Sequence, residues 1–215
     1  PAGEGLVSGQ EVFDAARYEK TYKGLERSTH VDRIILGRSR DGNEIVGLRM
    51  GDPAAPHRLV LLGRAHPPEV SGAIAMEAFL DTLVEQYDTG AIDPAKYQVL
   101  AVPLLNPDGV MRGHWRANLG GLDLNRDWGR FTQPETAAVG RWLDGLGLDV
   151  KPVVMIDFHS TQSNLFYVQG AEETAPPQEA FLQEWLGHRM GAFDAYPFKI
   201  ERRNANPGSG TSKNW

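Results

Sequence analysis

The chain has 215 residues, of which 41% are hydrophobic and 23% are charged, a composition typical of a globular protein and not of a disordered one. Its 28 acidic residues outnumber its 22 lysines and arginines, and the resulting net charge of −6 argues against a general nucleic-acid binder. Cysteine is absent, which excludes disulfides, thiolate metal sites and cysteine nucleophiles. No apolar run is long enough to suggest a membrane span, and no signal-peptide pattern is found. The length suits a single domain over residues 1–215, with 1–30 as an N-terminal lead-in.

The first half of the chain alternates predicted helices and strands. A helix is predicted over Ser8–Lys20, with Ser8 as a possible cap, and strands over Val31–Leu36 and Glu44–Met50. Arg58–Gly63 is mostly apolar and is typical of a buried strand, whereas Ser71–Tyr87 carries apolar residues at helical spacing.

The second half continues this alternation. Tyr97–Leu105 predicts a strand, and Asn106-Pro107-Asp108-Gly109 after it is a strong turn sequence. Thr132–Leu148 predicts a helix with Thr132 available as its cap. The remaining predicted elements are a strand over Val153–Phe158, a strand over Leu165–Val168, a helix over Pro177–Met190 and an irregular stretch over 204–210. Nearly continuous apolar strands between helices indicate an α/β protein with a mostly parallel or mixed sheet covered on both faces.

A histidine and a carboxylate stand three residues apart in His66-Pro67-Pro68-Glu69, where a predicted strand gives way to a long helix. Ligands bind at the carboxyl ends of strands in open α/β sheets, and both side chains can bind a divalent cation. A catalytic zinc site usually needs a third protein ligand, and His159 is the candidate because it also follows a buried strand. The alternative is a histidine at a strand end and a glutamate in a first helical turn, where the helix dipole favours negative charge.

Arginines gather in the stretch from 106 to 130. This loop-like segment of an acidic protein contains Arg112, Arg116, Arg126 and Arg130. Guanidinium groups form paired hydrogen bonds with carboxylates, and the neighbouring Asn125 adds a neutral donor. The segment therefore favours an anionic ligand.

These motifs, taken together and in this order, resemble the zinc metallocarboxypeptidases of the carboxypeptidase A type. The resemblance runs from about residue 31 to the last residue. It rests on Gly37-x-Ser39-x-x-Gly42, His66-x-x-Glu69, Asn106-Pro107-Asp108-Gly109, Arg116, Asp123-x-Asn125-Arg126-Asp127-Trp128 and His159-Ser160. It implies a zinc carboxypeptidase-like, phosphorylase/hydrolase-like fold, in which an eight-stranded, mostly parallel or mixed sheet is flanked by helices.

The same resemblance implies one Zn²⁺ ion held by His66, Glu69 and His159. Asp123 resembles the acid that orients one of the histidine ligands, a role that physical chemistry also expects around a metal. The implied activity is that of a metallocarboxypeptidase, a zinc hydrolase and protease.

The resemblance also assigns the substrate-binding residues. Arg116 would polarise the scissile carbonyl, while Asn125 and Arg126 would hold the free C-terminal carboxylate of a peptide substrate. The alternative for Arg126 is an ion pair with Asp123 or Asp127.

The chain departs from the family pattern in three places. The family's glutamate general base is expected beyond Trp215, so we expect the C-terminal part of the catalytic domain to be missing. Asn206 stands where the family often has a mobile tyrosine, and Pro68 replaces a substrate-binding arginine. These differences favour a bacterial-type branch. The glutamates that lie too early to be the base are Glu172, Glu173, Glu179, Glu184 and Glu201.

Two other functions remain open at this point. The first is a zinc amidase or deacylase acting on small acylated amino acids or murein peptides. The second is a non-catalytic module that binds C-terminal carboxylates. Many members of the family are exported, which favours a secreted or periplasmic protein over a cytoplasmic one.

Overall fold

The computed structural model describes residues 8–146, 153–192, 197–206 and 208–214. They belong to two compact units, Pro1–Ser160 and Thr161–Trp215. The prediction of a single domain over the whole chain stays a prediction. Among the described residues, no helix combines the length and the apolar character needed to cross a membrane.

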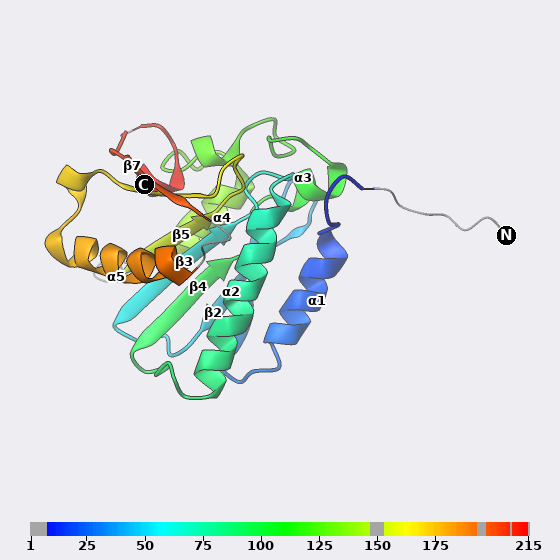
Figure 1. Ribbon diagram of the computed structural model, residues 1–215. Coiled ribbons are helices and arrows are strands. Elements are labelled where there is room, and N and C mark those ends of the chain that lie inside the picture. The colour runs from blue at the N-terminus through cyan, green and yellow to red at the C-terminus, as the bar shows by residue number, and fades with distance from the viewer. Residues whose placement is uncertain (1–7, 147–152, 193–196, 207, 215) are drawn as a thin grey trace. The chain divides into compact units, whose positions relative to one another are not determined.

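The first unit is built on a five-stranded mixed sheet with the strand order β1-β2-β4-β3-β5 (Figure 1). β3 is parallel to both β4 and β5, whereas β2 is antiparallel to β1 and β4. The strands are β1 (Val31–Arg38), β2 (Glu44–Met50), β3 (His57–Gly63), β4 (Tyr97–Val102) and β5 (Val154–Phe158). The predicted α/β class with a mixed sheet between helices is therefore confirmed. β4 ends before its predicted end at Leu105 because Pro103, which has no N–H group, cannot continue a central strand.

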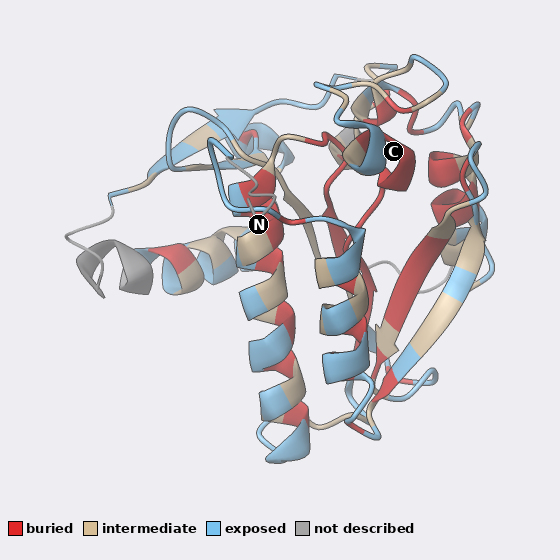
Figure 2. Ribbon diagram, turned by 90° about the vertical axis from the view of Figure 1, so that its right-hand side faces the viewer, coloured by how far each residue is buried: buried red, intermediate tan, exposed pale blue. Residues whose placement is uncertain are grey.

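Helices cover both faces of this sheet. α1 (Ala15–Leu25) and α2 (Val70–Asp88) lie side by side on one face, and α4 (Pro134–Asp144) lies on the other (Figure 1). Successive residues of β3 serve the two faces in turn, as the pleat of a strand requires. Leu61 packs in the cluster with the first two helices, whereas Leu62 packs in the cluster with α4. Figure 2 shows buried residues along the inner sides of the helices and exposed ones along the outer sides.

Two helices begin later than predicted because the hydroxyl expected to cap each one does not do so. α1 begins at Ala15 and not at Ser8, since the Asp14 side chain accepts a hydrogen bond from the Arg17 N–H at 3.0 Å. α4 begins at Pro134, and the Thr132 side chain donates to Asp127 instead of capping the helix. The predicted end of that helix at Leu148 lies outside the described residues.

The predicted turn at Asn106 to Gly109 opens a short helix, α3 (Pro107–Arg112). The Asn106 side chain accepts a hydrogen bond from the Gly109 N–H at 3.0 Å and so caps the helix. The turn prediction was wrong because asparagine and proline are favoured both in turns and at helix starts.

The second unit contains a two-stranded parallel sheet of β6 (Leu165–Gln169) and β7 (Lys199–Arg203), together with α5 (Pro176–Ala192). β7 was missed because four of its five residues are charged and none is fully buried. The described residues thus contain seven strands in two sheets, compared with the eight strands that the family resemblance implied. The part of the chain that the structure describes also contains three short 3₁₀ helices: η1 (Leu124–Arg126), η2 (Ala171–Glu173) and η3 (Ser212–Asn214).

Candidate metal centre

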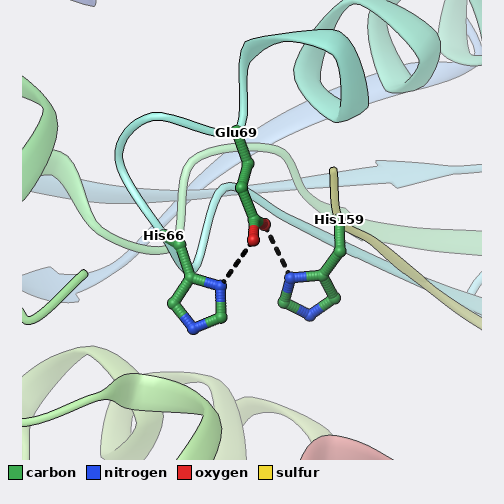
Figure 3. A group of neighbouring side chains, drawn as sticks. All are labelled: His66, Glu69 and His159. Carbon is green, nitrogen blue, oxygen red and sulfur yellow. Dashed lines mark hydrogen bonds and ion pairs between the residues drawn. The ribbon is translucent and has the colours of Figure 1, made fainter. Parts of the chain in front are cut away.

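Three side chains from two strand ends meet in the first unit. His66 and Glu69 follow β3, and His159 follows β5, which is the parallel neighbour of β3. Nδ1 of His66 lies 2.9 Å from Oε1 of Glu69, and Nδ1 of His159 lies 2.7 Å from Oε2 of the same carboxylate. Figure 3 shows both imidazoles turned toward this carboxylate. The structure therefore brings together the three residues that the sequence analysis placed at one metal site, and their role as ligands stays a prediction.

The chemistry of this group fits a zinc ion. One ligand atom from each residue lies within 4.8 Å of the others, so a single ion could be shared. Two imidazole nitrogens and one carboxylate form a donor set used by catalytic zinc sites, which keep a further position for water or substrate. Calcium and magnesium prefer oxygen ligands alone. The His66 side chain is only 4% exposed and the Glu69 side chain 14%, so the group is sheltered from solvent.

The paired charges shift the pKa values of these groups. Burial raises the pKa of Glu69, but the hydrogen bonds with His159 and His66 outweigh burial and bring it to about 2. Burial lowers the pKa of His159, whereas Asp157 and Glu69 raise it, with a net result of about 10. Glu69 is therefore an anion at neutral pH, and a bound cation has to displace a proton from His159.

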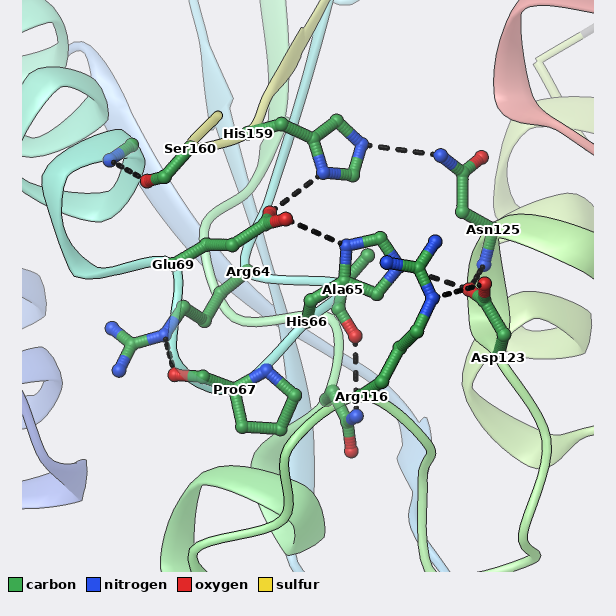
Figure 4. A network of polar contacts seen from close by, with 12 residues as sticks. Arg64, Ala65, His66, Pro67, Glu69, Arg116, Asp123, Asn125, His159 and Ser160 are labelled. Carbon is green, nitrogen blue, oxygen red and sulfur yellow. Dashed lines mark hydrogen bonds and ion pairs between the residues drawn. The ribbon is translucent and has the colours of Figure 1, made fainter. Parts of the chain in front are cut away.

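Asp123 holds the outer side of the His66 ring. Its Oδ1 lies 2.9 Å from His66 Nε2, and its Oδ2 accepts a hydrogen bond from Arg116 Nε at 2.8 Å (Figure 4). Burial raises the pKa of Asp123, but His66 and Arg116 lower it well below its usual value. The contact leaves His66 Nδ1 facing Glu69, and the role of Asp123 at the metal stays a prediction.

Arg64 fixes the loop that carries His66, and the sequence analysis missed it. This arginine is 4% exposed and has a φ of 53°, a backbone conformation that is rare for residues other than glycine. Its Nε donates to the carbonyl of Pro67 at 2.8 Å, and its other nitrogens donate to Phe13 and Tyr18 at 3.3 Å. On the other side of the loop, Asn106 donates to the Ala65 carbonyl at 3.1 Å. An arginine directly between a buried strand and the histidine motif was the only sequence signal for this role.

His159 is held by the first turn of α2. The Ser160 hydroxyl accepts a hydrogen bond from the Gly72 N–H at 2.8 Å (Figure 4). A Cβ atom on Gly72 would lie 2.8 Å from the His159 carbonyl oxygen, closer than real Cβ contacts. Glycine is thus required by this close approach, which the sequence alone did not reveal.

The predicted substrate-binding residues lie next to the metal group. Asn125 and Arg126 belong to η1, which follows Asp123, and Asn125 Nδ2 lies 3.3 Å from His159 Nε2. The Arg126 side chain is exposed and donates to the Asn125 carbonyl at 2.5 Å. Among the ion pairs of the described residues, none joins Arg126 to Asp123 or Asp127, the alternative that the sequence left open. The side chain of Arg116 is half exposed.

Comparison with known families agrees with this geometry. A family model described as zinc carboxypeptidase matches residues 20–193. The chain belongs to the zinc carboxypeptidase family. The predicted resemblance is therefore confirmed, and zinc is the metal of the family. Its general base, expected beyond Trp215, and the secreted or periplasmic location stay predictions.

Similar proteins extend beyond the length of this chain. Cytosolic carboxypeptidase 2 of Danio rerio is 26% identical over 235 residues, which cover 96% of this chain but 32% of the zebrafish protein. A metallo-carboxypeptidase from Pseudomonas aeruginosa, solved in complex with (2-guanidinoethylmercapto)succinic acid, is 24% identical with a TM-score of 0.76 and covers 94% of this chain and 56% of its own. Murein-tripeptide amidase from Escherichia coli O157 is 18% identical with a TM-score of 0.54, covering 87% and 77%. The chain thus spans about a third of the zebrafish relative and about half of the first solved structure, and the two structures share its fold.

Proposed function

We propose that the protein is a zinc-dependent metallocarboxypeptidase that hydrolyses the C-terminal peptide bond of peptides. The observation that carries the proposal is the meeting of His66, Glu69 and His159 at adjacent strand ends, with Asn125 beside them. A metal group alone would suit many hydrolases. The neighbouring Arg126, exposed and without an ion-pair partner among the described residues, adds a site for a carboxylate.

Some of these residues serve the metal site and others bind the substrate. When bound, zinc supplies an activated water and polarises the carbonyl. Asp123 keeps His66 oriented, and the Nη groups of Arg116 donate where negative charge develops, since its Nε is bound to Asp123. Asn125 and Arg126 hold the terminal carboxylate and so place the last peptide bond over the metal.

Zinc content tests the metal assignment. The protein should bind one zinc ion. His66→Ala and His159→Ala should each remove most of that binding, because each variant keeps only two of the three protein ligands that a catalytic zinc site usually needs. His57→Ala is the matched control, because His57 is an exposed histidine at the start of β3, the strand that leads to His66. Stoichiometric zinc in both site variants, measured by elemental analysis after dialysis, would rule out the site.

The terminal carboxylate tests the exopeptidase assignment. The full gene product should cleave a free-acid peptide and leave its C-terminal amide intact. Arg126→Ala should reduce kcat/KM for the acid by about 10- to 100-fold, the range expected for a lost charged hydrogen bond. Arg130→Ala is the control, since it removes an exposed arginine four residues away. Equal cleavage of acid and amide by the unaltered protein would count against the role of Asn125 and Arg126.

A zinc amidase acting on murein peptides or acylated amino acids is the second candidate, because the murein-tripeptide amidase shares the fold. A substrate panel separates the two: turnover of acylated amino acids or murein peptides without turnover of ordinary peptides identifies an amidase. Tight peptide binding with no turnover of any substrate identifies the non-catalytic carboxylate-binding module.

A further inference from the structure

Asp157 is the one polar residue of β5, whose other members are Val154, Met155, Ile156 and Phe158. Its side chain is 17% exposed, and aspartate is disfavoured in strands. Placing a carboxylate on this strand costs free energy unless a partner compensates it. His159 is such a partner, because its Nε2 lies 3.2 Å from Asp157 Oδ2.

We propose that Asp157 is a positioning residue for the metal: it accepts a hydrogen bond from His159 Nε2 and so keeps Nδ1 free to bind the ion. The inference rests on the zinc site of the proposed function but not on its peptidase activity. β5 ends at Phe158, one residue before His159, so the strand holds Asp157 close to the ring that it contacts.

The two histidines are held in the same way. Each ring turns Nδ1 toward Glu69 and Nε2 toward an aspartate, Asp123 for His66 at 2.9 Å and Asp157 for His159. A neutral imidazole carries a single ring proton, and an acceptor at Nε2 keeps the proton there. Both rings then present an unprotonated Nδ1 to the same cation, as expected for a metal whose histidines are each oriented by a carboxylate.

Asn125 also approaches this nitrogen, but with a different role. Its Nδ2 lies 3.3 Å from His159 Nε2, and an amide nitrogen donates and cannot accept the ring proton. The acceptor of the ring proton is therefore Asp157. Zinc affinity should consequently depend on Asp157 and not on Asn125.

Zinc affinity and the ring proton of His159 provide the test. In competition with a chelator, Asp157→Ala should bind zinc about 10- to 100-fold more weakly, the usual cost of losing such a partner. Asp81→Ala, which removes one exposed carboxylate from α2, and Asn125→Ala should change the affinity less than threefold. In the zinc-loaded ¹⁵N-labelled protein, a slowly exchanging Nε2–H signal of His159 should be present and should be lost in Asp157→Ala.

The outcomes separate this inference from the proposed function. If the unaltered protein binds no zinc, the metal site itself fails. If it binds zinc and Asp157→Ala keeps both the affinity and the ring-proton signal, Asp157 has no positioning role. An equal loss in Asp157→Ala and Asp81→Ala would show an effect of net charge alone and would also overturn the proposal.

Discussion

At the scale of single residues, one absent methyl group decides how closely α2 approaches His159. Gly72→Ala places a Cβ atom 2.8 Å from the His159 carbonyl, so the backbone of His159 has to move. Zinc affinity should fall by about tenfold or more, as for the loss of a supporting contact, although alanine raises helix propensity by about 1 kcal/mol.

Gly24→Ala is the matched control for that substitution. Gly24 lies in α1, and a Cβ atom there would meet nothing within 4 Å. This variant should be slightly more stable and bind zinc normally. Isothermal titration of both variants checks the pair, and unchanged affinity in Gly72→Ala would show that the close approach does not matter for the metal.

Sequence reasoning found the three residues of the candidate metal group and missed the residues that hold them in place. His66, Glu69 and His159 were visible because each follows a strand and has metal-binding chemistry of its own. Arg64 and Gly72 act through contacts with distant segments, namely Phe13, Tyr18 and His159. Such contacts have no local pattern, so single-sequence reasoning could not predict them.

At the scale of elements, Asp127 joins η1, which carries Asn125 and Arg126, to α4. It follows Arg126 directly, and its carboxylate accepts hydrogen bonds from the N–H groups of Thr132 at 3.1 Å and Gln133 at 2.9 Å, and from the hydroxyl of Thr136. Burial raises the pKa of Asp127, but the hydrogen bonds from Thr132 and Thr136 outweigh burial and lower it below the model-compound value of 3.8.

The direction of this shift sets a pH dependence. A carboxylate with a lowered pKa in the folded protein adds stability above pH 3.8, and that stability is lost as the pH falls through the folded-state pKa. Asp127→Asn should lower the free energy of unfolding by about 1–3 kcal/mol at pH 7, the cost of weakened buried hydrogen bonds. The difference from the unaltered protein should shrink below about pH 4. Urea unfolding across this pH range measures it.

Asp144→Asn controls for the loss of one carboxylate charge near α4, because Asp144 is exposed at the C-terminal end of that helix. Its unfolding free energy should stay within about 0.5 kcal/mol of the unaltered value at every pH. A difference between Asp127→Asn and the unaltered protein that is constant with pH would contradict the assigned ionisation of Asp127.

The limits of the strands were predicted well where the strand is buried and its sequence is therefore apolar. β2 was predicted with its observed limits, and β1, β3 and β5 within two residues, because apolar runs mark buried strands. β7 was missed because exposed strands lack that signal. The starts of α1 and α4 were wrong because Asp14 and not Ser8 caps α1, and because Thr132 donates to Asp127 instead of capping α4.

At the scale of the whole molecule, the alternation of helices and apolar strands predicted the α/β class and a mostly parallel or mixed sheet. The strand order was beyond the sequence, since β4 lies between β2 and β3 although β3 comes first along the chain. That order places β5 beside β3 at the edge of the sheet, and hence His159 beside His66.

The neighbouring positions of β3 and β5 have a consequence for folding. An ion coordinated by both His66 and His159 would close a loop of roughly ninety residues of the chain. Closing so large a loop costs the unfolded chain conformational entropy. The cation would therefore serve as a removable cross-link as well as a reagent, holding an edge strand against the sheet's interior.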